Sequence, residues 1–324
     1  MVVAPARPKH PAAVAGRKRP PPGRSVAPAA RSRRLGVGFI LPVVVFVAVF
    51  YLYTLARNVT LSFQDYDIRS LYSGNAPFIG LANYRKLLST PAFGTAVVNT
   101  AVFVVGSLVF QFTIGLGLAE FFRRSFPLGR LLRSLVLIPW LLPLVVSGTL
   151  FRWMLDTSNG VVNQILLTLH LVQDPVPWLN TPDTAMAAVL LCNIWIGVPF
   201  NMVILHGGLQ TIPTELYEAA SLDGAGRWQQ FRYVTLPQLR PVISIVLTLG
   251  LIYTLKVFDV IWVMTKGGPA NATNTISTYA YQLSFGGLSE FGLGAAAGVL
   301  LVLVASVFAL LYLRTLRAEP GVRA

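Results

Sequence analysis

The chain has 324 residues, of which 54% are hydrophobic and only 12% are charged, and its mean hydropathy is +0.64. Soluble domains carry about 25% charged residues, so this composition excludes an ordinary soluble protein and indicates an integral membrane protein. The net charge of +14 is compatible with a nucleic-acid partner. The basic residues, however, are concentrated in polar segments between apolar runs, so we expect no nucleic-acid binding.

The chain begins with a basic, proline-rich segment, residues 1–34, which contains nine Lys or Arg and no acidic residue. Such a segment buries too little apolar surface to fold, so we predict a disordered cytoplasmic tail. The apolar run at 35–56 is too long for the hydrophobic part of a signal peptide and long enough to cross a bilayer. We therefore predict that residues 35–92 form a retained first transmembrane helix and an outer loop.

Five further apolar runs follow, each long enough to cross about 30 Å of hydrocarbon as a helix. With the first run, they predict an all-α integral membrane protein with six transmembrane helices and a short cytoplasmic tail at 315–324. The five runs are 93–122, 131–154, 184–207, 242–265 and 291–313.

The distribution of basic residues orients these helices. With the N-terminal tail inside, the cytoplasmic segments hold 19 of the 26 Lys and Arg, and the rest of the chain holds seven. An excess of basic residues marks the cytoplasmic side of a membrane protein. The sequence therefore predicts that both termini, and the polar segment at 208–241, lie in the cytoplasm.

Eight polar residues lie in or at the edge of the apolar runs. Polar side chains are costly against lipid, so these should face the bundle interior or a water-filled cavity, and the sequence leaves open whether they bond between helices or line the cavity. Lys256 and Asp259 are three residues apart, which on one helix would place them on the same face, able to pair. The eight residues are Asn99, Gln111, Asn193, Asn201, Tyr253, Thr254, Lys256 and Asp259.

Motifs of catalysis and cofactor binding are absent from the sequence. It contains no G-x-x-x-x-G-K-[ST] for ATP phosphates, no G-x-S-x-G and no H-E-x-x-H. The three histidines have no partner at metal-ligand spacing, and a single cysteine, Cys192, excludes a disulfide framework. We therefore expect that the protein is not an enzyme and holds no metal or cofactor.

The polar segment at 216–241 organises the second half of the chain. Apolar and acidic residues at helical spacing predict a short helix that ends at Gly224. A second short helix follows from about Arg227, and Pro237 and Pro241 are expected to stop it before the next span.

The spacing within this segment resembles the EAA loop of bacterial ABC importer permeases. Its elements are Glu218-Ala219-Ala220, three residues, Gly224, nine residues and Val234-Thr235-Leu236-Pro237. Further residues resemble the maltose-type sugar branch of that family. These are Ile212-Pro213, Leu216-Tyr217, Leu222-Asp223-Gly224-Ala225, and Phe258-Asp259 followed by Gly267-Gly268-Pro269.

The resemblance implies a type I ABC importer permease fold over residues 93–314, in a subunit that carries a sugar or sugar-like solute across the bacterial cytoplasmic membrane. It implies a second, homologous permease subunit, two ATP-binding subunits and an extracytoplasmic solute-binding protein as partners, besides membrane lipid. It also implies that the loop at 216–237 couples the permease to an ATP-binding subunit. The coupling residues would be Glu218, Ala219, Ala220, Asp223, Gly224, Leu236 and Pro237.

The resemblance also implies positions in the solute pathway. In the maltose-type branch, the helices just before and just after the EAA loop contact the sugar. Counted from Glu218, the matching positions here are Asn193, Gly197, Gly250 and Thr254. Asn193 and Thr254 offer side-chain hydrogen bonds, and the glycines leave room; the identity of the sugar does not follow from these residues.

A self-contained secondary transporter or channel is the alternative function. Secondary transporters typically show repeated halves and broken helices around a midplane site, often with carboxylates for ion coupling. The sequence shows neither paired halves nor a midplane carboxylate cluster, and it contains the importer-type loop. The importer permease is therefore our prediction.

Overall fold

The computed structural model describes residues 40–124 and 126–318, and in these residues it is helical, with one isolated β-bridge between Gln64 and Phe78. The all-α prediction is confirmed for this part of the chain. The predicted tail at 1–34 lies outside the described residues, as do residues 319–324 of the C-terminal tail.

The helices differ in length from single turns to more than thirty residues. In chain order they are η1 (Ala48–Leu52), α2 (Tyr53–Ser62), α3 (Ile68–Ser73), α4 (Ala82–Ser89), α5 (Pro91–Phe122), α6 (Gly129–Val136), α7 (Ile138–Leu141), α8 (Leu144–Met154), α9 (Val161–Thr168), α10 (Pro182–Gln210), α11 (Thr214–Leu222), α12 (Arg227–Gln230), η2 (Phe231–Thr235), α13 (Leu236–Leu255), α14 (Asp259–Thr265), α15 (Ile276–Phe285) and α16 (Phe291–Ala318). The two η elements are π-helical turns.

Five continuous helices are long and apolar enough to cross a membrane: Ile40–Ser62, Pro91–Phe122, Pro182–Gln210, Arg227–Leu255 and Phe291–Leu310. The third predicted span is not one straight helix, because it consists of Gly129–Leu141 and Leu144–Met154, bent by 97°. The bend falls at Leu142 and Pro143, where Leu142 is extended with ψ 142°. Proline excludes the helical conformation from the residue before it, which explains the break. Six spans result if the bent pair crosses as one.

The fifth predicted span differs from the structure at both ends. The helix begins at Arg227, runs through Pro237 and Pro241, and ends at Leu255. The prediction that these prolines stop a helix is therefore wrong. Because Pro237 has no N–H to donate, the turn before it, Phe231–Thr235, is bonded in the wider π pattern, which keeps the helix continuous.

The described residues fall into two units, which divide between Thr54 and Leu55. In the described part of the first unit, residues 40–54, no side chain is buried. Large apolar side chains such as Phe46 and Phe50 are therefore more than half exposed there, as expected of a helix surrounded by lipid.

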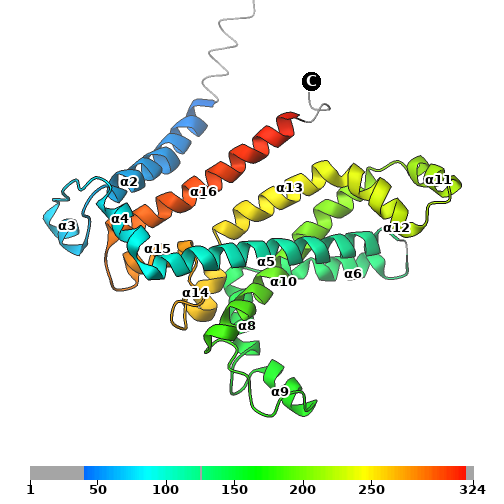
Figure 1. The fold of residues 1–324 in the computed structure, drawn as a ribbon, viewed down its shortest axis with the longest axis horizontal. Coiled ribbons are helices and arrows are strands. Elements are labelled where there is room, and N and C mark those ends of the chain that lie inside the picture. The colour runs from blue at the N-terminus through cyan, green and yellow to red at the C-terminus, as the bar shows by residue number, and fades with distance from the viewer. Residues whose placement is uncertain (1–39, 125, 319–324) are drawn as a thin grey trace, which may run out of the picture. The chain divides into compact units, whose positions relative to one another are not determined.

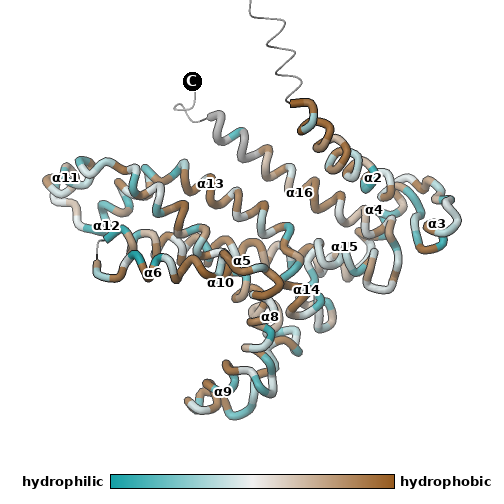
Figure 2. The backbone as a smooth tube through the Cα atoms, turned by 180° about the vertical axis from the view of Figure 1, so that it is seen from behind, coloured by the Kyte–Doolittle hydropathy of each residue, from teal (hydrophilic) through white to brown (hydrophobic). Residues whose placement is uncertain are grey.

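The second unit is built around α5 and α10, which pack along each other (Figure 1). Figure 2 shows hydrophobic residues along both helices. Near their middle, Phe103 of α5 and Val189 of α10 are almost fully buried together with residues of α8 and α14. At one end of α5, Phe93 packs with α4, α15 and α16. At its other end, Phe122 packs with the last turns of α10 and the first turns of α13.

The two ends of this unit bring together the segments that the sequence assigns to opposite sides of a membrane. On the predicted outer side, Lys86 forms an ion pair of 2.7 Å with Glu290, and Gly292 donates its N–H to Tyr66. Here Asp67 caps the N-terminus of α3: its carboxyl accepts the Ser70 N–H, and this bond lowers the pKa of Asp67. At the other end, the segment after α5 meets the segment 208–241.

Candidate functional site

A cavity of about 560 Å³ lies beside α10, between the middle of α5 and the last turns of α13. Helices α7, α8 and α14 contribute single residues to its wall. All four positions proposed for the solute pathway line it: Asn193, Gly197, Gly250 and Thr254. The remaining wall residues are Gln111, Trp140, Leu144, Ile196, Phe200, Tyr253, Lys256, Val257 and Asp259.

The polar wall of this cavity is held by bonds between α5 and α10. Gln111 donates to the backbone oxygen of Asn193 at 2.9 Å, and Asn193 donates through Nδ2 to the Ser107 hydroxyl at 2.8 Å. These bonds fix the Asn193 amide and leave its Oδ1 without a partner among the described residues. Thr254, on the opposite helix, offers a hydroxyl. The wall therefore presents a fixed acceptor and a hydroxyl to the cavity.

The two glycines act by allowing close packing. A methyl group on Gly197 would overlap the side-chain amide of Gln111, and one on Gly250 would come within 2.8 Å of a Leu108 methyl group. The space that Gly197 leaves is thus filled by Gln111 and is not open. The prediction that the glycines simply leave room for solute needs this refinement, because Gly197 positions a polar side chain in the wall.

Three aromatic rings form a second wall. Trp140 of α7 lies 5.8 Å from Phe200 of α10, and Phe200 lies 6.1 Å from Tyr253 of α13, measured between ring centroids. Trp140 and Tyr253 are about half exposed, at 48% and 53%. A wall that combines amide groups with exposed rings suits a ligand with both hydroxyl groups and apolar C–H faces.

The break between α13 and α14 closes one end of the cavity. Lys256 caps the C-terminus of α13, and Asp259 begins α14, so the two residues are not on one helix face. Of the two ion pairs in residues 40–124 and 126–318, neither involves Lys256 or Asp259. The Lys256 ammonium instead lies 4.9 Å from the centroid of the Tyr253 ring. Of the two possibilities that the sequence left open, pairing is absent because the helix ends between these residues, and both line the cavity.

The polar segment after α10 forms the two short helices predicted from the sequence. α11 ends at Leu222, Asp223 caps it, and Gly224 adopts a φ of +81°, which side chains other than glycine rarely accept. The Ala225 N–H returns to the oxygen of Ala220 at 2.9 Å and closes the turn. The predicted end of the first helix at Gly224 is confirmed.

This segment is braced against both α5 and α13. The guanidinium of Arg123, which follows α5, lies 4.2 Å from the centroid of the Tyr217 ring and pairs with Glu120 at 3.4 Å. The Tyr217 hydroxyl is 3.0 Å from the hydroxyl of Thr235, a buried residue in the π-helical turn. A displacement of α11 therefore reaches α5 and α13 through one side chain.

One surface of this segment is largely exposed in the structure. Glu218 and Ala219 are exposed on α11, and Ala220 is half-buried. Two large apolar side chains beside them are almost fully exposed, Leu222 at 90% and Trp228 at 73%. Exposed apolar side chains next to small residues are typical of a surface that binds another protein. Leu236 and Pro237 lie behind it, half-buried, at the start of α13.

Sequence reasoning located some cavity residues and missed others. Six of the eight intramembrane polar residues line the cavity, whereas Asn99 bonds to the backbone of 271 and 274, and Asn201 bonds to Gly197 within α10. Trp140 and Phe200 were missed, because apolar residues in apolar runs give no signal. In the structure, the bend at Pro143 lays α7 against α10, which brings Trp140 to the cavity. Within the described part of the chain, no group of three His, Cys, Asp or Glu side chains is placed to hold a metal ion.

Residues 111–318 match the family model described as "Binding-protein-dependent transport system inner membrane component". This range contains every residue that lines the cavity, and it contains the whole segment from α11 to α13.

Curated relatives cover most of the chain. The trehalose/maltose transport system permease protein of Thermococcus litoralis is 35% identical over 284 residues, 88% of this chain and 94% of the relative. The sulfoquinovosyl glycerol transport system permease protein of Agrobacterium fabrum is 35% identical over 288 residues, 89% of this chain and 92% of the relative. Both are transport permeases by name and not enzymes.

A solved structure has the same fold. A chain of a bacterial ABC transporter involved in the import of the acidic polysaccharide alginate superposes with a TM-score of 0.77 at 26% identity, covering 90% of this chain and 98% of that one. A second structure of the bacterial alginate transporter contains a periplasmic protein bound to an alginate pentasaccharide. The predicted ABC importer permease fold is thereby confirmed.

Proposed function

Because the chain belongs to the family of binding-protein-dependent transport system inner membrane components, we propose that it is the permease subunit of an ATP-driven importer for a sugar or sugar-like solute. The observation that carries the solute class is the cavity, whose wall combines an amide, a hydroxyl and three aromatic rings. Its volume, about 560 Å³, is in the usual range for a small-molecule site.

The relatives support a carbohydrate and differ in which one. Their names specify trehalose or maltose, sulfoquinovosyl glycerol and alginate, which range from neutral disaccharides to an acidic polysaccharide. We assign to Asn193 and Thr254 the side-chain contacts with solute hydroxyl groups. Gly197 and Gly250 act indirectly, by allowing the helices that carry these contacts to approach Gln111 and Leu108.

The segment from α11 to the start of α13 is proposed as the contact with an ATP-binding subunit. A permease without a nucleotide site must receive mechanical work through a stiff joint. Glu218, Ala219 and Ala220 would sit in the partner, where Glu218 forms a charge-assisted bond with a basic residue. Asp223 and Gly224 turn the chain behind the docking helix, and Leu236 and Pro237 lead into α13.

The same proposal extends to the assembly and its orientation. One copy of this chain, a second homologous permease subunit and two ATP-binding subunits would form the transporter in the bacterial cytoplasmic membrane, and an extracytoplasmic binding protein would deliver the solute. In this assembly both termini would lie in the cytoplasm. The contact between Arg123 and Tyr217 supports a shared side for the segment after α5 and the segment 216–237, both of which the basic residues assign to the inside.

Uptake of labelled sugars by the reconstituted transporter tests the solute site. We expect Asn193→Ala and Thr254→Val to raise the half-saturating solute concentration at least tenfold, since each removes a hydrogen bond made to the solute. Asn201→Ala is the matched control, because Asn201 is an equally buried asparagine of α10 that does not line the cavity. Unchanged affinity and rate in both cavity variants would remove these residues from the solute pathway.

A further inference from the structure

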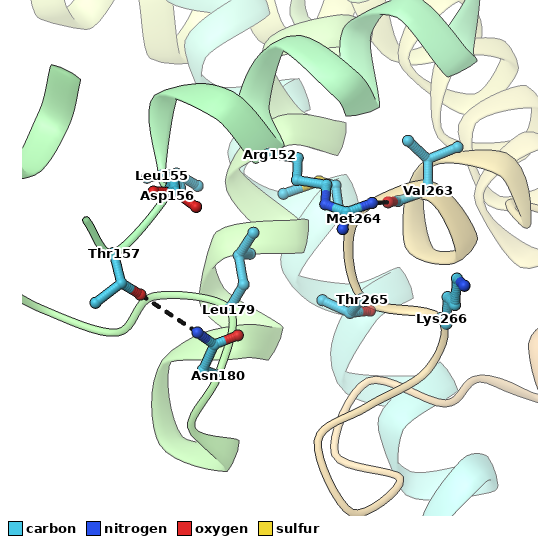
Figure 3. Close-up of a pocket in the computed structure, with 10 residues that line it drawn as sticks. All are labelled: Arg152, Leu155, Asp156, Thr157, Leu179, Asn180, Val263, Met264, Thr265 and Lys266. Carbon is cyan, nitrogen blue, oxygen red and sulfur yellow. Dashed lines mark hydrogen bonds between the residues drawn. The ribbon is translucent and has the colours of Figure 1, made fainter. Parts of the chain in front are cut away.

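A second pocket lies at the ends of α8 and α14 that are remote from the cavity. α8 and α14 pack against each other, and their first residues, Leu144 and Asp259, line the cavity described above. Their last turns line a separate pocket of about 320 Å³ (Figure 3). Since α14 has seven residues, the two sites are about 10 Å apart along it. The second pocket faces the side that the sequence predicts to be outside.

This pocket concentrates positive charge on a face that has little of it. Only seven of the 26 basic residues lie outside the predicted cytoplasmic segments, and two of these, Arg152 and Lys266, line the pocket. Both are exposed, and neither is in either ion pair of residues 40–124 and 126–318. Arg152 makes one contact of 3.4 Å with the backbone oxygen of Val263, which leaves most of its donors free.

One carboxylate also lines the pocket. Asp156 accepts the backbone N–H groups of Ser158 and Asn159 through a single oxygen, at 3.0 and 2.9 Å, and so holds its own loop. Figure 3 shows Asp156 and Thr157 across the pocket from Lys266, and Asn180 donating to the Thr157 hydroxyl. The pocket therefore has a net positive charge, with polar side chains on the opposite wall.

The chemistry of this pocket differs from that of the solute cavity. None of its lining residues is aromatic, so it offers no ring on which a sugar could stack. It offers instead a guanidinium and an ammonium, the groups that bind carboxylates most strongly. We propose that this pocket receives a Glu or Asp side chain of the solute-binding protein when that protein docks on the outer face.

The inference rests on the proposed importer function and adds a defined contact to it. The C-terminal ends of α8 and α14 favour the positive charge of Arg152 and Lys266, and these two side chains, not the helix ends, would hold the carboxylate. The same two helices begin at the solute cavity. A protein docked at the pocket would therefore hold the outer ends of helices whose inner ends form the cavity wall, so docking and the shape of the cavity are linked.

The test uses the complete transporter in liposomes, with its ATP-binding subunits and its solute-binding protein. The measured quantity is the binding-protein concentration that gives half-maximal stimulation of ATP hydrolysis. We expect Arg152→Glu and Lys266→Glu each to raise it about tenfold, and the double variant to raise it further. Hydrolysis without binding protein should stay at the wild-type rate, which shows that the variants assemble. Arg85→Glu, the same charge change at another exposed outer residue, is the matched control.

A suppressor experiment identifies the partner residue. Among binding-protein variants with one surface Glu or Asp changed to Lys, we expect one to restore stimulation of the Arg152→Glu transporter. The proposal would be overturned if the double variant of Arg152→Glu and Lys266→Glu changed the binding-protein concentration for half-maximal stimulation less than about twofold. An equal effect of Arg85→Glu on this concentration would also overturn it. If the variants changed the preference between neutral and anionic sugars and left the half-maximal binding-protein concentration unchanged, the pocket would be assigned to the solute instead. A wild-type transporter that no binding protein stimulates would refute the importer function itself.

Discussion

The contact between Gly197 and Gln111 predicts an unusual response to a single methyl group. In Gly197→Ala, the new Cβ would overlap the Gln111 amide, with Oε1 at 2.6 Å. Gln111 is buried and donates to the backbone oxygen of Asn193. The Gln111 amide is the far end of a flexible side chain that already lines the cavity, so this amide can turn into the cavity.

The expected loss of stability is small. Turning Gln111 away breaks one hydrogen bond, worth about 0.5–1.5 kcal/mol, or about 0.6 kcal/mol on average inside membrane proteins. The Asn193 oxygen keeps its helical bond, so no buried acceptor is left without a partner. The effect on transport should be larger, because the displaced amide occupies solute space. We expect about a tenfold weaker apparent solute affinity, equivalent to about 1.4 kcal/mol.

Two glycines of α5, Gly115 and Gly117, provide the comparison. In Gly115→Ala, the methyl group would lie 2.6 Å from Asn201 Cβ and 3.1 Å from the Met202 backbone nitrogen. Neither atom can rotate away, so α5 and α10 must separate, which costs about 1–3 kcal/mol. Gly117 has no atom within 4 Å of the added methyl group, so Gly117→Ala should be neutral or stabilising.

The assay combines the free energy of unfolding in mixed micelles with solute uptake in liposomes. A double variant, Gly197→Ala with Gln111→Ala, provides the decisive measurement, because it removes the side chain that the methyl group displaces. It should be no less stable than Gln111→Ala alone. Additive losses, or a greater loss of stability for Gly197→Ala than for Gly115→Ala, would refute the packing argument.

Three further predictions concern coupling and orientation. Glu218→Lys and Gly224→Asp should abolish solute-stimulated ATP hydrolysis while the subunit still inserts in the membrane. Glu218→Lys acts by charge repulsion, and Gly224→Asp acts because a φ of +81° costs a residue with a side chain about 1 kcal/mol or more. Full transport by the double variant would reduce the segment to a simple connector. Tyr217→Leu removes the contacts with both Arg123 and Thr235, so it should leave ATP hydrolysis high and solute uptake low. Tyr217→Phe should have a milder effect, and Arg124→Gln serves as the control. Equal losses of hydrolysis and uptake in Tyr217→Leu would contradict a role of Tyr217 in transmitting motion. Reporter fusions at Gly74 and Gly224 should report opposite sides of the membrane, and the same side for both would overturn the topology.

The sequence predicted best what depends on local pattern. Apolar runs of sufficient length gave the spans, and the end of α11 near Gly224 was expected because glycine commonly follows a helix end; the structure adds that this glycine has a left-handed φ of +81°. Prolines were harder to interpret. Pro143 lies at a bend of 97°, whereas Pro237 and Pro241 lie in a continuous helix; a π-helical turn before Pro237 accommodates its missing donor. Whether a proline breaks a helix thus depends on packing that one sequence does not display.

The cavity was only partly predictable for a related reason. Gln111, Asn193 and Thr254 stand out because polar residues are rare in apolar runs. Trp140 and Phe200 do not, and their contact exists only because the bend at Pro143 lays α7 against α10. The separation of Lys256 from Asp259 depends on a helix end that periodicity does not reveal.

The helix that follows the coupling segment links the two proposed sites. From Arg227 to Leu255 it is continuous over 29 residues, or about 43 Å. Thr235, which bonds to Tyr217, lies near its start, and Thr254 lies at its end in the cavity wall. A stiff helix transmits an axial shift over its whole length, and the break after Leu255 is the first place where the chain can absorb it. Work delivered to α11 should therefore move the Thr254 wall relative to α14, which changes the cavity at the residues that contact the solute.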